Sequence, residues 1–99
     1  MTQLHDDLVA VRELLSDPVR WTKGVFARDS RGWPVNWGDN NAVAWCLEGA
    51  CLKATNNKAH RLWWRLEEVG AFTCTSLFND AVEHPNVLAL LDRAIEATP

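Results

Sequence analysis

The cysteines are the residues of this chain best suited to covalent chemistry. Cys46 lies about one turn into an expected helix, where the helix dipole can lower the pKa of a thiol. A thiol nucleophile also needs a base, for which His60 and His84 are candidates, and an orienting group such as Asn79 or Asp80. The spacing alone does not bring these groups together, and a free cysteine on an apolar helix face is more often a core residue. Catalysis at Cys46 is therefore an alternative, and we expect a non-enzymatic protein.

The spacing of cysteine and histidine argues against a metal site. Cys46 and Cys51 would lie about 140° apart around a helix, whereas two zinc ligands on one helix are usually three or four residues apart. The three histidines fall on separate segments. The sequence also lacks a glycine-rich phosphate loop and a G-x-S-x-G nucleophile elbow. We expect no metal and no cofactor.

Tryptophan is the second unusual feature, because the chain has six Trp and no Tyr. Several indoles are interleaved with basic residues, which is the composition of an interface hot spot and also suits stacking on single-stranded nucleic acid. The expected binding surface consists of Arg20, Trp21, Lys23, Arg28, Arg31, Trp33 and Trp37. The indoles would equally serve to seal this segment onto the helices, and Trp45 and Trp63 are expected in the core.

Length, composition and charge limit the classes of protein. The 99 residues, 47% hydrophobic and 23% charged, predict one globular domain over residues 1–99. No apolar run approaches a membrane span, the N-terminal residues do not resemble a signal peptide, and the odd number of cysteines favours a reducing cytoplasm. The net charge of −3, with a short basic segment between acidic ends, favours neither a duplex-binding protein nor a DNA mimic.

The elements that must position these residues follow from apolar periodicity and turn residues. The fold class is α+β, mainly helical, with helices over about 3–16, 41–54, 58–69 and 85–97. Asp39 or Asn40 is expected to cap the second helix. Gly49 inside that helix predicts a close neighbour, and Gly70 is expected just beyond the third helix.

A small β-hairpin over about 24–36, packed on the helices, completes the prediction. Its strands lie near residues 24–28 and 33–36 on either side of a turn over residues 29–32. Pro34 cannot donate a ladder hydrogen bond, which predicts an edge strand. Between the third and fourth predicted helices, residues 71–78 are expected to be extended or irregular, and Asn79-Asp80 is expected to form a turn or cap.

These motifs together resemble a family of small proteins of bacteria and their phages that has no assigned function. The resemblance spans about residues 21–97 and rests on Trp21-x-x-Gly24, Ala27-Arg28-Asp29-x-x-Gly32-x-Pro34-Val35, Trp45-Cys46-Leu47-Glu48-Gly49-Ala50 and Asn79-Asp80. The chain departs from the family pattern at Phe78, where Trp is usual, and at the charged Glu48. The resemblance implies a bacterial or phage origin and no particular reaction. Arg28-Asp29 and Asn79-Asp80 are expected to brace turns.

We therefore expect a small cytoplasmic protein, encoded by a phage or mobile element, that binds a host protein or protein complex. Inhibition of a host defence complex is one specific form of this hypothesis. The alternatives are a thiol enzyme using Cys46 and a single-stranded nucleic-acid binder using the basic hairpin. Homodimerisation through exposed Trp is also compatible with the sequence, and a membrane partner is not expected.

Overall fold

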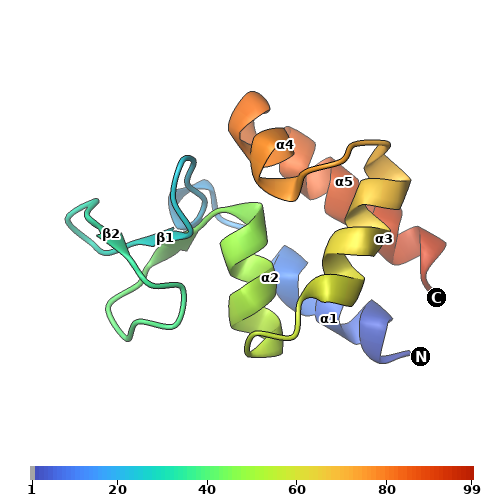
Figure 1. The fold of residues 1–99 in the computed structure, drawn as a ribbon, viewed down its shortest axis with the longest axis horizontal. Coiled ribbons are helices and arrows are strands. Elements are labelled where there is room, and N and C mark those ends of the chain that lie inside the picture. Colours follow the sequence, from blue (N-terminus) through green and yellow to red (C-terminus); the bar gives the residue numbers. More distant parts are fainter. Residues whose placement is uncertain (1) are drawn as a thin grey trace.

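The computed structural model describes residues 2–99 and is mainly helical, with five α-helices and a small three-stranded antiparallel sheet (Figure 1). The elements in chain order are α1 (Gln3–Leu14), the 3-10 turn η1 (Pro18–Arg20), β1 (Ala27–Arg28), β2 (Pro34–Val35), β3 (Ala44–Trp45), α2 (Leu47–Thr55), α3 (His60–Gly70), α4 (Thr75–Ala81) and α5 (His84–Ala97). The expected fold class is confirmed, but the expected number of helices was one too low, because α4 was not foreseen.

The first helix matches its prediction at the start and ends earlier than expected. The Thr2 hydroxyl accepts a hydrogen bond from the His5 N–H at 3.1 Å, as an N-cap should. The helix ends at Leu14 and not at residue 16, because the Ser16 N–H bonds to the Glu13 carbonyl in a tighter turn. The chain then enters η1, which Asp17 caps.

The second helix begins six residues later than predicted, at Leu47. The Asp39 carboxylate does not cap a helix but accepts the Asn41 N–H at 2.7 Å, which holds a turn. Residues 44–45 then form β3, and the Cys46 N–H bonds back to the Phe26 carbonyl at 3.2 Å. Because the backbone of this segment bonds to the sheet, Cys46 and neither Asp39 nor Asn40 is the N-cap.

The predicted hairpin is present, with shorter strands and an additional partner. Ala27 pairs with Val35 and Arg28 with Pro34, and the strand order β2-β1-β3 places Pro34 on an edge, as expected. The third strand, β3, pairs with the other side of β1. The sheet lies at one end of the helical body, opposite the end where the chain begins and finishes (Figure 1).

The remaining helices differ from prediction at their ends. Gly70 is the last residue of α3, and Ala71 takes the left-handed conformation at φ 57°. A Cβ at position 70 would lie 2.5 Å from the Phe72 ring, so a larger residue there would force this side chain to move. Helix α4 begins at Thr75, so the second half of the segment predicted as extended or irregular over residues 71–78 is helical, and Asn79-Asp80 lies inside this helix and not in a turn or cap. Helix α5 begins at His84, one residue before the predicted start, because Glu83 and Asn86 form a capping box there.

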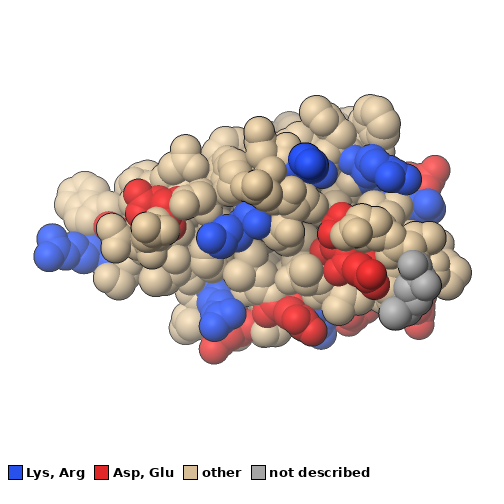
Figure 2. All heavy atoms as spheres, turned by 90° about the horizontal axis from the view of Figure 1, so that it is seen from below, with Lys and Arg blue, Asp and Glu red and all other residues tan. Residues whose placement is uncertain are grey.

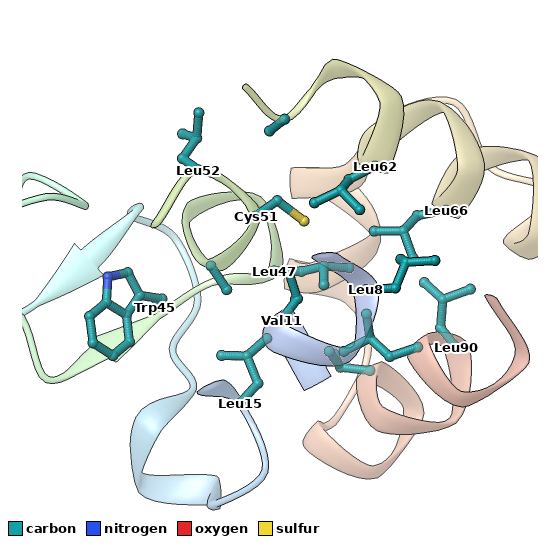
Figure 3. Close-up of a cluster of buried hydrophobic side chains, with 14 of the residues drawn as sticks. Leu8, Val11, Leu15, Trp45, Leu47, Cys51, Leu52, Leu62, Leu66 and Leu90 are labelled. Atoms are coloured by element: carbon teal, nitrogen blue, oxygen red, sulfur yellow. The ribbon is translucent and has the colours of Figure 1, made fainter. Parts of the chain in front are cut away.

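The core is built from the leucine-rich faces of four helices (Figure 3). Leu8 and Val11 of α1 face Leu47 and Cys51 of α2, with residues of α3 and α5 closing the cluster. Trp45 is buried at the edge of this core, as predicted, whereas Trp63 is only partly buried against it. In residues 2–99, no helix is both long and apolar enough to cross a membrane.

Gly49 explains how the sheet joins the core. A Cβ at this position would lie 2.1 Å from the Phe26 carbonyl oxygen. The loop before β1 therefore packs directly on the backbone of α2, which confirms the close neighbour expected from a glycine inside a helix.

Candidate functional site

Arg28, predicted to belong to a binding surface, holds the loops of the sheet together. Its guanidinium donates to the Thr22 hydroxyl at 2.7 Å, to the Gly32 carbonyl at 3.0 Å and to the Lys23 carbonyl at 3.1 Å. These three bonds tie the segment before β1 to the hairpin turn. A guanidinium with this many fixed partners is a brace for the loops, which leaves little of it for a ligand.

Asp29 fixes the hairpin turn and presents Trp33 to solvent. Its carboxylate accepts the backbone N–H groups of Arg31 at 2.9 Å and Trp33 at 3.0 Å. Gly32 takes a positive φ of 84°, which completes the turn. The Trp33 side chain is 66% exposed, so a rigid backbone carries an indole that packs little against the rest of the chain.

Trp21, Lys23 and Trp37, also predicted to bind, are engaged within the molecule. The Trp21 Nε1–H donates to Asn79 at 2.6 Å, and the Lys23 Nζ lies 5.4 Å from the centre of the Trp21 ring. Lys23 also lies 3.7 Å from a Glu83 carboxylate oxygen. The Trp37 carbonyl accepts the Trp45 Nε1–H at 3.0 Å. The contacts of these residues are therefore with other parts of the chain, and they hold the segments around the hairpin in place.

The remaining predicted binding residues, Arg20, Arg31 and Trp33, line the outer side of the hairpin. Two adjoining hollows of about 620 and 460 Å³ lie there, and they share Asp29, Ser30 and Val43. We call this surface the hairpin face and define it by Val19, Arg20, Arg31, Trp33 and Val43. All five side chains are exposed.

The two arginines of the hairpin face, Arg20 and Arg31, take no part in the salt bridges described within residues 2–99. Figure 2 shows basic and acidic side chains intermingled on the side that it presents, with wide uncharged areas between them. The side that Figure 2 presents therefore carries scattered charges of both signs and no broad field of one sign.

Sequence reasoning did not predict five of the exposed apolar residues among residues 2–99, which are Val19, Phe26, Val43, Trp64 and Leu77. Val43 was expected on the buried stripe of the helix predicted over residues 41–54, but it lies before that helix begins and is 46% exposed. Trp64 is 67% exposed. Its position next to Trp63 on α3, outside the buried stripe of Leu62 and Leu66, was a signal that could have identified it.

A third hollow, of about 440 Å³, lies where the loop before β1 meets α2 and α4. We call it the thiol cavity, and its lining residues are Gly24, Val25, Phe26, Val35, Cys46, Ser76 and Asp80. The structure thus brings together Cys46 and Asp80, two residues of the alternative thiol-enzyme hypothesis. His84 does not line this cavity: its Nε2 lies 2.6 Å from the Leu15 carbonyl oxygen, and its ring lies beside Trp21.

The protonation of the cysteines does not favour a nucleophile in the thiol cavity. Burial raises the pKa of the Cys46 thiol, and the carboxylates of Glu48 and Asp80 raise it further. Burial also raises the pKa of Cys51. In contrast, the hydrogen bond with the Ser76 hydroxyl lowers the pKa of Cys74. The cavity therefore holds a protonated thiol at neutral pH.

Asn79, considered above as an orienting group for catalysis, is a buried residue whose side chain hydrogen-bonds to several segments of the fold. Its Oδ1 accepts the Trp21 Nε1–H at 2.6 Å and the Leu47 N–H at 3.0 Å. Its Nδ2 donates to the Thr22 carbonyl at 3.0 Å and to Asp80 Oδ1 at 3.3 Å. The side chain therefore joins the loop after η1, the start of α2 and helix α4, which confirms that Asn79-Asp80 braces the fold.

Comparison with protein families gives one match. The family of unknown function DUF6197 covers residues 1–97, which agrees with the resemblance to a family without an assigned function. No curated protein and no solved structure matches the chain. Among residues 2–99, no group of three or more His, Cys, Asp or Glu side chains could hold a metal ion.

Proposed function

We propose that the chain, which belongs to the DUF6197 family of unknown function, acts by binding a partner protein through the hairpin face. The observation that carries this proposal is the exposure of Trp33 on a rigid turn, beside two hollows and two unpaired arginines. Trp and Arg are the residues most enriched in interface hot spots, where they supply most of the binding energy.

The chemistry of the face indicates the kind of partner segment. Trp33, Val19 and Val43 offer apolar contact, and the adjoining hollows provide depth for side chains of the partner. Within residues 2–99 neither Arg20 nor Arg31 forms a salt bridge, so both guanidinium groups are available to carboxylates of a partner. We therefore propose an exposed protein segment that combines apolar and acidic side chains.

Charge favours a protein over single-stranded nucleic acid. A groove for a nucleic-acid strand follows the phosphate backbone with several cations. The hairpin face has two free cations, the Asp29 carboxylate lines both hollows, and the chain carries a net charge of −3. The resemblance to phage and bacterial proteins extends the proposal to a host protein complex in the cytoplasm, with inhibition of a defence complex as one form of it.

Position-specific cross-linking tests this function. A photo-reactive residue at position 33 should capture a protein in host cells that the same residue at position 64 does not. Trp64 is a matched control for Trp33, because the two residues are 67% and 66% exposed and lie in different parts of the fold.

The captured protein is then purified and its affinity measured by calorimetry. Trp33→Ala should weaken binding by roughly 30-fold, as expected for a hot-spot residue worth about 2 kcal/mol. Trp64→Ala should leave the affinity unchanged. If both substitutions weaken binding equally, the hairpin face is not the interface. If position 33 captures only RNA or DNA, and binding to fluorescent single strands falls steeply with salt, the nucleic-acid alternative replaces this proposal.

A further inference from the structure

We propose that the thiol cavity is a second binding site, which takes a small organic cation consisting of a primary amine attached to one apolar group. This inference does not depend on the function proposed for the hairpin face, from which the cavity differs in all its lining residues.

The cavity has an apolar part and a polar part. Val25, Phe26 and Val35 supply the apolar part from the sheet and the loop before it. The polar groups come from the helices: the Cys46 thiol at the start of α2, and Ser76 and Asp80 on α4. The volume of about 440 Å³ lies within the range typical of small-molecule sites. A ligand with one charged end and one apolar end matches this division.

Asp80 is the charged group of the cavity, and its position is fixed. Its Oδ1 accepts the Gly24 N–H at 3.0 Å and the Asn79 Nδ2–H at 3.3 Å. Because two donors from different elements hold one oxygen, the carboxylate is oriented before any ligand arrives. Preorganisation of this kind reduces the entropy lost on binding.

The surroundings of the cavity carry negative charge without a balancing cation. Glu48 interacts electrostatically with Cys46, and burial, followed by the nearby Glu67 carboxylate, raises the pKa of Glu48. Within the described chain, residues 2–99, none of Glu48, Glu67 and Asp80 forms a salt bridge. An ammonium group in the cavity would therefore gain attraction from Asp80 directly and from Glu48 at longer range.

The start of α2 does not turn the cavity into an anion site, although helix N-termini attract anions. The Leu47 N–H donates to Asn79 Oδ1 at 3.0 Å, and the Gly49 N–H donates to the Cys46 sulfur at 3.2 Å. The Glu48 N–H also interacts with this sulfur. Since these N–H groups already have partners and Glu48 places a carboxylate in the first turn, the start of α2 offers an anion carboxylates in place of its own N–H donors.

Titration of the full chain with phenethylamine tests the site. We expect amide chemical-shift changes at the lining residues, Gly24 and Ser76 among them, with a dissociation constant on the order of 1 mM, as befits a ligand of this size. The neutral analogue 2-phenylethanol and the anion 3-phenylpropionate have similar apolar parts. We expect the alcohol to bind roughly threefold more weakly, because Asp80 is exposed and solvent weakens an exposed charge pair, and we expect the anion not to bind.

Asp80→Asn isolates the carboxylate, because the amide oxygen can still accept from Gly24 and Asn79. It should weaken phenethylamine binding roughly threefold, the size expected for an exposed charge pair, and leave the weaker binding of 2-phenylethanol unchanged. Asp6→Asn, which makes the same change of charge on the exposed first turn of α1, should have no effect. The site is disproved if phenethylamine shifts no lining residue, or if amine and alcohol bind equally. The two-analogue comparison on the natural chain decides the matter even if Asp80→Asn does not fold.

Discussion

Replacement of Asn79 is the most informative perturbation of this fold. The side chain is completely buried and takes part in four hydrogen bonds. A hydrogen bond contributes about 0.5–1.5 kcal/mol net, and a buried donor left without a partner costs about 1–3 kcal/mol. In Asn79→Ala the Leu47 N–H stays buried without an acceptor, whereas the Trp21 Nε1–H and the Thr22 carbonyl are partly buried and can reach water.

We therefore expect Asn79→Ala to lower the free energy of unfolding by about 3–5 kcal/mol, a large part of the roughly 5–10 kcal/mol typical of such a domain. Urea denaturation followed by circular dichroism measures this loss. Asn40→Ala, at an exposed asparagine outside this network, should change stability by less than about 0.5 kcal/mol. A double-mutant cycle with Trp21→Phe should give a coupling energy of about 1 kcal/mol. A loss below about 1 kcal/mol for Asn79→Ala would refute the reasoning that this amide joins three segments.

Three further predictions concern the sheet and the cysteines. Gly49→Ala should destabilise the protein by about 2–4 kcal/mol in thermal unfolding, because the new methyl group would overlap the Phe26 carbonyl; unchanged stability would contradict the close packing. Arg28→Ala should increase the hydrogen exchange of the hairpin turn amides while the core helices keep their protection, and loss of protection everywhere would disprove a local role. Iodoacetamide labelling, read out by mass spectrometry, should modify Cys74 first and at a lower pH than an ordinary thiol, whereas Cys46 should react slowly even at neutral pH. The reason is that the pKa of Cys74 is lowered and that of Cys46 is raised. Faster labelling of Cys46 than of Cys74 would support the thiol-enzyme hypothesis.

Elements governed by local pattern could be predicted from the sequence. The apolar stripes of α1, α3 and α5 located both ends of each of these helices to within about two residues, because the buried positions of a helix repeat with a fixed period. Pro34 indicated an edge strand because it lacks an N–H donor. Gly49 indicated a close neighbour because a glycine inside a helix otherwise only costs stability.

Elements held by distant partners could not be predicted. Strand β3 exists because its backbone pairs with β1, so the run of apolar residues around Val43 and Trp45 was read as the beginning of a helix. Helix α4 is only seven residues long and is held in part by Asn79, three of whose four hydrogen-bond partners lie 32 to 58 positions away in the chain. No local pattern contains this information.

The candidate binding residues were predicted by type but not by exposure. Trp21, Trp33 and Trp37 look alike in the sequence, yet only the Trp33 side chain is strongly exposed. The difference depends on where each side chain and its backbone find partners: Asn79 binds the Trp21 indole, and Trp45 binds the Trp37 carbonyl. Such partners are known only once the chain has folded.

The residues that carry the family resemblance and those that form the hairpin face are different sets. Motif residues such as Trp21, Arg28, Asp29 and Asn79 bond to one another's segments and hold the loops in place. The residues of the hairpin face lie at positions that the motif leaves unspecified, between or beside these anchors. Because the backbone of the turn is fixed by the anchors, an exposed side chain can change with little effect on the fold. A scaffold of this kind can keep its structure while the residues of the hairpin face change, which agrees with the proposal that this face binds a partner.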